Sequence, residues 1–399
     1  MNAILWYLDG MLRTLTARLY PSTSQVARLE HLLDVGRTIF NDALEQRIAA
    51  YEFDKSSLSY MTQTADLTIL RSVCPTLADV PAWIERDALR RVDLAFKHFF
   101  RRVRESSGKA GFPRFKAWQR WNSFSIQSPG QCVRDKHIRV AGVTGTIRAR
   151  NIQYTEGAIK QLRIVRRAGK WFAQLVVDDG QQTPAAVPIM SCVGIDVGLK
   201  TFATMSNGDT IANPRFARKA ERKIAHAQRA VSRKVKGSRN RRKAVNRLQQ
   251  VYERVSNLRS NFTHHASKEI VTQYQFIAVE DLEITDMVGG RFAKSILDAA
   301  WGQFTQRLAY KAESAGCIFV RVEPRGTTQE CSQCGTVVPK DIRVRVHSCP
   351  SCGLTIDRDL NAARNVLQRA LMDATSVAGR ANGNACGGLG CEPREAGSP

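Results

Sequence analysis

Apolar and polar residues alternate over positions 193–200, and this period of two predicts a β-strand with one buried face. Asp196 stands in the middle of this strand, with a glycine two residues away on either side. Burying a carboxylate costs free energy unless a cation or hydrogen-bond donors meet it. The glycines leave room for a metal ion or a phosphate backbone to approach closely. Residues 201–212 then predict a second strand, a turn at 207–209 and the start of a third strand.

In the N-terminal half, the spacing of the apolar residues changes twice. Alternation before Pro21 predicts a strand, and a helical period with one apolar face then runs through residues 23–52 and 83–105. Short alternating segments with turn residues between them return at 137–178 and predict a small β-barrel. If the first strand pairs with these later strands, the helices form a lobe that is inserted into the barrel.

Residues 108–127 interleave glycine, proline, aromatic and cationic residues. This mixture suits a loop that holds a nucleic-acid backbone by charge and a base by stacking. Arg114 and Lys116 are the candidate backbone contacts in this loop.

The C-terminal half predicts a helical hairpin, two more strands and two more helices. The expected elements are a hairpin at 215–259 broken at 236–238, strands at 276–284 and 317–324, a long helix at 295–316 and a final helix at 355–371. Residues 372–399 are rich in glycine and poor in core residues, so we expect a disordered tail.

Charge narrows the class of partner. Sixty Lys and Arg against 36 Asp and Glu leave a net charge of +24 at pH 7. Such a charge predicts a polyanionic partner, most simply nucleic acid, although a basic membrane-binding protein is an alternative. No apolar run approaches the ~18 residues of a membrane span, and the N-terminus lacks the basic start of a signal peptide. We therefore expect a cytoplasmic, nucleoid-associated protein with reduced thiols and no membrane partner.

Two helical segments concentrate the cations. The like charges of 215–259 repel one another unless phosphates neutralise them, and repeated Val and Leu positions argue against a disordered basic tail. The basic face of 83–105 could equally be an ordinary solvated face, but the net charge favours nucleic acid. The candidate contacts on these two segments are Arg101, Arg102, Arg233, Lys236, Arg241, Arg242 and Lys243.

Four cysteines have the spacing of a metal site. Cys331, Cys334, Cys349 and Cys352 form two C-x-x-C pairs, and thiolates on two such knuckles reach one tetrahedral Zn²⁺. Iron–sulfur or redox chemistry is the alternative. Four thiolates leave no open position for water, so we expect a structural zinc.

Acidic residues provide a second candidate metal site. Asp196, Glu280 and one of the pair Asp357 and Asp359 would meet in an RNase H-like domain, because two lie on adjacent strands and the third on a helix across the sheet. Carboxylate oxygens select Mg²⁺ or Mn²⁺, and two such ions about 3.5–4 Å apart would activate water and stabilise the leaving oxygen in phosphodiester hydrolysis. Capping of the last helix is the alternative role for either aspartate. Glycoside hydrolysis also uses carboxylate pairs, but it fits a basic chain with a four-cysteine site poorly.

The chain resembles the TnpB family of insertion-sequence-encoded, RNA-guided nucleases, which are related to type V CRISPR effectors. The matching stretches cover nearly the whole chain in the family's order: RLYPSTSQ (18–25), AFKHFFRR (95–102), GFPRFK (111–116), GIDVGLKTFAT (194–204), VEDLEI (279–284), AKSILDAAWGQF (293–304), YKAESAG (310–316) and TTQECSQCG…CPSCGLTIDRDLNAARN (327–365). The last stretch is the most specific. The family starts near Met11, so the first ten residues have no match.

This resemblance implies a multidomain α+β fold and a site. The third acid is then Asp359, with Asn361 beside it. Asp357 and Asp281 then either support the metal ligands from behind or cap a helix. The implied parts are a wedge β-barrel (1–22 and 106–188), a helical recognition lobe (23–105), a RuvC-like nuclease domain (189–328) with the basic hairpin 215–259, a zinc-bearing nucleic-acid-binding insert (329–354), a final RuvC-like helix (355–371) and the tail (372–399).

The resemblance also implies partners. They are a guide RNA transcribed from the end of the element and target DNA, double-stranded beside a short adjacent motif and single-stranded where it pairs with the guide. We expect one protein molecule per guide RNA.

Two functions are therefore in view. The first is a Mg²⁺-dependent, RNA-guided DNA endonuclease, which the presence of all three acids favours. The second is an RNA-guided DNA-binding repressor or transposition regulator that does not cut. A DDE-type transposase is a weaker third, because no apparatus for handling 3′ ends is evident.

Overall fold

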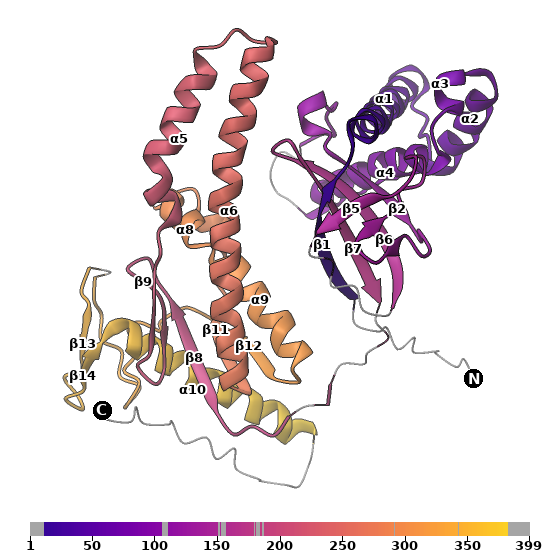
Figure 1. Ribbon diagram of the computed structural model, residues 1–399. Coiled ribbons are helices and arrows are strands. Elements are labelled where there is room, and N and C mark those ends of the chain that lie inside the picture. Colours follow the sequence, from indigo (N-terminus) through magenta and orange to yellow (C-terminus); the bar gives the residue numbers. More distant parts are fainter. Residues whose placement is uncertain are drawn as a thin grey trace, which may run out of the picture. The chain divides into compact units, whose positions relative to one another are not determined.

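The protein is described by a computed structural model that covers residues 12–105, 111–150, 152, 157–178, 180, 184–185, 187–290, 292–341 and 343–381 (Figure 1). The chain divides into two compact units, residues 1–182 and 183–399. Residues 1–10, which the resemblance does not match, lie outside the described ranges. Across those ranges no helix combines the length and apolar character needed to cross a membrane.

The first unit contains an antiparallel sheet of seven strands. Its order is β2-β6-β7-β1-β5-β4-β3. The strands are β1 (Leu12–Tyr20), β2 (Ser123–Gln127), β3 (Val133–Arg134), β4 (His137–Ile138), β5 (Ile147–Arg150), β6 (Ala158–Arg167) and β7 (Lys170–Asp178). The strand before Pro21 does pair with later strands, since β1 lies between β7 and β5. Within the described residues no ladder joins the end strands β2 and β3, so closure into a barrel stays a prediction.

Helices follow β1 directly and return the chain to the same sheet. They are α1 (Thr23–Asp54), α2 (Tyr60–Val73), α3 (Pro75–Ala78) and α4 (Ala82–Glu105), with a short 3₁₀ turn at Trp118–Arg120. Ser22 caps α1 in a reciprocal pair with Gln25, which satisfies two otherwise unpaired N–H groups. One apolar core joins α1 and α4 to the sheet.

Two features of this unit differ from the sequence expectation. Helices α2 and α3 were not predicted, because their exposed apolar residues blur the period. Residues 123–127, expected to belong to a loop, form strand β2. Phe124 and Ile126 of this strand are buried, and its pairing with β6 outweighs the loop-like composition around it.

The second unit is built on a mixed five-stranded sheet of order β10-β9-β8-β11-β12. The strands are β8 (Cys192–Val197), β9 (Thr201–Met205), β10 (Thr210–Ala212), β11 (Phe276–Glu280) and β12 (Ile318–Val322). Strands β8 to β10 run antiparallel, as the alternation predicted, and β11 lies parallel to both β8 and β12.

Helices cover both faces of this sheet (Figure 1). They are α5 (Phe216–Ser232), α6 (Arg239–Gln273), α7 (Ile284–Met287), α8 (Ala293–Ala299), α9 (Trp301–Ser314) and α10 (Arg358–Ala381). On β11, Ile277 and Val279 belong to the core with α6 and α9, whereas Phe276 and Ala278 belong to the core with α10. This alternation follows from the period of two in a strand with both faces covered.

Helix boundaries differ from expectation in several places. Helix α6 runs to Gln273, past the expected end of the hairpin at 259, and residues 355–357 form a short strand before the last helix. The helix predicted at 295–316 is broken, because Ala300 adopts a left-handed conformation with φ of 60° between α8 and α9. The last helix runs past residue 371 to Ala381, into the segment expected to be disordered. The rest of that tail, 382–399, lies outside the described residues.

Candidate active site and four-cysteine cluster

Three buried or half-buried acids come from three elements of the second unit. Asp196 lies on β8, and Glu280 ends the parallel neighbour β11. The last registered pair of these strands is Val279 opposite Ile195, so Asp196 and Glu280 follow side by side at the same sheet edge. Asp359 lies in the first turn of α10, which packs against β8.

Close packing of α10 brings Asp359 to this edge. A Cβ atom at Gly194 would lie 2.2 Å from the Ala363 carbonyl oxygen and 2.7 Å from the Leu367 nitrogen, so only glycine admits the helix backbone here. A Cβ atom at Gly198 would lie 4.0 Å from Asp359 Oδ2. The sequence predicted room for a metal ion or a phosphate backbone beside these glycines, but at Gly194 the backbone of α10 occupies that space.

The three acids share one electrostatic environment. Burial raises the pKa of Asp196 well above its usual value, and the charges of Glu280 and Asp359 raise it further. Burial also raises the pKa of Glu280, against a hydrogen bond from Thr327 and the positive charge of Arg369. Carboxylates whose pKa values are raised by burial and by one another mark a candidate functional site.

Asp357 and Asp359 have different roles in this structure. Asp357 is exposed and caps α10, accepting hydrogen bonds from the N–H groups of Asp359 (2.8 Å) and Leu360 (3.4 Å). Asp359 is buried, with Oδ1 at 2.9 Å from Arg358 and Oδ2 at 3.5 Å from Arg345. Sequence reasoning missed both arginines, since nothing in their spacing distinguishes them from other cations of this basic chain.

The remaining neighbours of the site are Thr327 and the pair Asp281–Arg321. The Thr327 hydroxyl donates to Glu280 Oε1 at 2.6 Å. Asp281 is exposed and pairs with Arg321 at 3.2 Å. Asp281 therefore belongs to an ion pair at the surface, and the supporting role expected for it stays a prediction.

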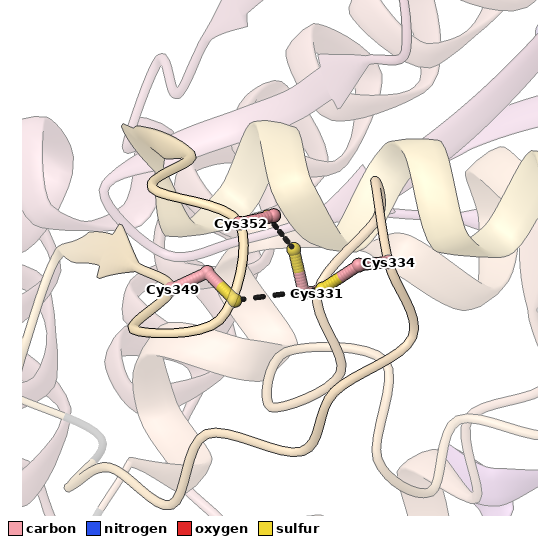
Figure 2. A group of neighbouring side chains, drawn as sticks. All are labelled: Cys331, Cys334, Cys349 and Cys352. Atoms are coloured by element: carbon pink, nitrogen blue, oxygen red, sulfur yellow. Dashed lines mark hydrogen bonds between the residues drawn. The ribbon is translucent and has the colours of Figure 1, made fainter.

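The four cysteines of the predicted metal site come together (Figure 2). Their sulfur atoms all lie within 4.8 Å of one another, with Cys331 3.6 Å from Cys352 and Cys334 3.6 Å from Cys349. Tetrahedral zinc with Zn–S bonds of ~2.3 Å requires sulfurs about 3.8 Å apart, so the cluster fits Zn²⁺. Hydrogen bonds with Thr336 lower the pKa of Cys334 to about 6. Against a backbone hydrogen bond at Leu354, burial and the neighbouring sulfurs raise the pKa of Cys352 to about 12. Among the described residues, the three acids form no comparably close group.

One face of α10 holds the first knuckle. Asn361 accepts from the Ser332 N–H at 2.9 Å and donates to the Glu330 carbonyl at 2.6 Å, and Gln368 donates to the Ser332 carbonyl at 2.9 Å. Asn361 is fully buried. The asparagine that the resemblance placed beside the third acid therefore anchors the cysteine knuckle to the helix that carries Asp359.

His347 lies near the four cysteines but has another partner. It is fully buried on β13 (Val346–Ser348), which pairs with β14 (Thr355–Asp357), and its Nδ1 contacts Lys340. Burial and the charge of Lys340 lower the pKa of His347. This geometry agrees with a sulfur-only ligand set.

The predicted nucleic-acid contacts are mostly exposed. Arg101, Arg102, Arg114, Arg233, Lys236, Arg242 and Lys243 are exposed, and Lys116 is half-buried over the ring of Phe40. Arg241 differs, because its guanidinium donates to the carbonyls of Val231 (2.8 Å) and Lys234 (3.0 Å). It thereby ties the end of α5 to the start of α6, and this use of its donors explains its partial burial.

Family models match three parts of the chain. OrfB_IS605, described as a probable transposase, matches residues 174–291, and the TNB domain of Cas12f1-like proteins matches 301–366. A helix-turn-helix model of the OrfB_IS605 group matches 11–56, although α1 runs without a break through most of that stretch.

Curated relatives span most of the chain. A Streptomyces pristinaespiralis protein named RNA-guided DNA endonuclease is 32% identical over 368 residues, 90% of this chain and 89% of that protein. InsQ of Escherichia coli K12, named RNA-guided DNA endonuclease, is 27% identical over 88% of this chain and 90% of its own. Cas12f1 of Sulfoacidibacillus thermotolerans, named a CRISPR-associated endodeoxyribonuclease, is 27% identical over 57% of each chain.

A solved structure shares the fold. The Cas12f1 chain of a Cas12f1–sgRNA–target DNA complex superposes with a TM-score of 0.53 at 13% sequence identity, covering 90% of this chain and 99% of that one.

Proposed function

This chain belongs to the TnpB family, and on that premise we propose that it is an RNA-guided DNA endonuclease that hydrolyses target phosphodiesters at a two-metal site. The observation that supports the proposal is that Asp196 and Glu280 lie at the same end of two paired strands, while α10 packs on β8 with Asp359 in its first turn, near enough for the charges of Glu280 and Asp359 to raise the pKa of Asp196 beyond the effect of its burial. The relatives named RNA-guided DNA endonucleases support the same activity.

The donor chemistry of the acids suits Mg²⁺. They offer only hard carboxylate oxygens, which Mg²⁺ and Mn²⁺ prefer. When bound, two such ions would activate a water and stabilise the leaving 3′ oxygen. Asp196 and Glu280 would hold ions from the sheet edge and Asp359 from the helix. Arg358 and Arg345, which now neutralise Asp359, would move aside or turn to the phosphate as an ion binds.

The remaining parts of the proposal follow the family. The second unit is a RuvC-like nuclease domain, and its cysteine cluster holds a structural Zn²⁺ in a nucleic-acid-binding insert. The first unit combines a wedge barrel with a recognition lobe. One protein molecule binds one guide RNA, and the complex recognises DNA next to a short motif by base pairing along the guide.

The function is tested on the protein purified with its nucleic acid. Sequencing should find one dominant copurifying RNA, and this complex should cut a plasmid that carries the matching target beside randomised flanking sequence. Cutting should need Mg²⁺ and stop in EDTA. A protein that carries no RNA, or that cuts equally in EDTA, would refute the proposal. Guide-dependent binding without any cutting would favour a repressor.

Cations at the tip of the α5–α6 hairpin provide a further prediction. Changing Arg233, Lys236, Arg242 and Lys243 together to Gln should weaken guide-RNA binding and reduce its dependence on salt. Each phosphate contact contributes roughly 0.7–0.9 to the slope of log K against log salt, so losing four should lower the slope by about 3. Filter-binding titrations across salt concentrations measure this slope.

Arg241→Gln is the contrasting variant. The Arg241 guanidinium closes the hairpin through two carbonyls. The variant should therefore lower the thermal stability of the hairpin, while the slope of log K against log salt should change little. A quadruple variant with an unchanged slope would show that the tip does not bind phosphate.

A further inference from the structure

The side chain of Thr327 donates a hydrogen bond to the catalytic candidate Glu280. Its hydroxyl lies 2.6 Å from Glu280 Oε1 and 3.0 Å from the carbonyl oxygen of Pro324, and the residue is only 2% exposed. A threonine hydroxyl has one proton to donate. The carboxylate is the closer and the charged acceptor, so it takes that proton.

The loop that carries Thr327 is itself fixed. Asn365 of α10, which is 4% exposed, donates to the carbonyls of Thr327 (2.8 Å) and Glu330 (2.7 Å). Arg369, on the same helix, donates to the carbonyls of Glu323 (2.9 Å) and Arg325 (2.8 Å). The Thr327 hydroxyl is therefore a donor held in place by α10, and it cannot follow a freely rotating glutamate.

We propose that Thr327 is a positioning residue that fixes the carboxylate of Glu280 for cation binding. By occupying Oε1 it restricts the rotamers of Glu280 and leaves Oε2 as the oxygen available to an ion. Helix α10 then sets two of the three acids, carrying Asp359 in its first turn and orienting Glu280 through Asn365 and Thr327. This inference rests on the proposed function, since it assigns Glu280 a metal.

Thr327→Val tests the proposal, because valine keeps the shape of threonine and removes only the donor. In the guide-RNA complex, the Mn²⁺ concentration for half-maximal cleavage should rise about 10–100-fold, the loss usual when the partner of a metal ligand is removed. Mn²⁺ binding measured directly by electron paramagnetic resonance should weaken by the same factor. Guide-dependent DNA binding should not change, because Thr327 is buried and is not among the predicted nucleic-acid contacts.

Two matched variants separate positioning from packing. Thr327→Ser keeps the hydroxyl and should retain wild-type Mn²⁺ dependence. Thr328→Val removes the neighbouring hydroxyl, for which the described part of the chain shows no hydrogen bond, and should also behave as wild type. If Thr327→Val folds poorly, the serine variant still decides, since a loss of Mn²⁺ affinity in Thr327→Ser would assign the effect to packing.

The outcomes distinguish this inference from the function on which it rests. Wild-type Mn²⁺ dependence in Thr327→Val, with cleavage intact, would overturn the positioning role alone. A wild-type complex that does not cut in Mg²⁺ or Mn²⁺ would overturn the proposed function itself.

Discussion

Replacing Asp196 with alanine should abolish target cleavage while leaving guide-dependent DNA binding nearly intact. Asp196 lies on the central strand β8, where burial and then the charges of Glu280 and Asp359 raise its pKa. If the proposed two-metal site is correct, removing Asp196 takes away one of its ligands. The rate should fall by more than the roughly 10–100-fold that follows when only a neighbour of a metal ligand is changed.

Cleavage of a matched plasmid and gel-shift binding of the same target measure the two effects separately. Asp286→Ala is the matched control, because Asp286 is an exposed acid of the same unit, on α7, and its side chain makes no hydrogen bond or ion pair with the described residues. It should cut at the wild-type rate. An Asp196→Ala protein that still cuts would show that the active site lies elsewhere.

Replacing Cys331 with serine should destabilise the second unit more than it slows the chemical step. Cys331 is 2% exposed and lies next to Ser332, whose backbone α10 holds through Asn361 and Gln368. Zinc binding to such clusters supplies folding free energy, about 10–16 kcal/mol in zinc-finger peptides, so losing one thiolate should cost several kcal/mol of it. We expect less bound zinc per protein and an unfolding midpoint lower by at least several degrees.

Metal analysis of the purified protein and thermal unfolding check this result. Cys317→Ser is the control, since Cys317 is a half-buried free thiol of the same unit outside the cluster. It should keep the wild-type zinc content and midpoint. Full activity and full yield of Cys331→Ser without zinc would contradict a structural role for the cluster.

Local patterns in the sequence determined much of this protein. The strand with Asp196, the antiparallel strands after it and the basic hairpin all appear where the period placed them. The four cysteines converge as their spacing required. Periodicity and knuckle spacing depend on neighbours within one element or one turn, so they can be read without knowing the fold.

The tertiary structure decided what each polar side chain does, because its partners are distant in the sequence. From spacing alone either Asp357 or Asp359 could cap the last helix; only the fold shows that Asp357 caps while Asp359 is buried among arginines. Asn361 turned out to anchor a cysteine knuckle, and Thr327 to meet Glu280 across 47 positions. A hydrogen bond between residues so far apart in the sequence produces no periodic pattern in the chain. It forms only when the packing of the fold brings the two segments together.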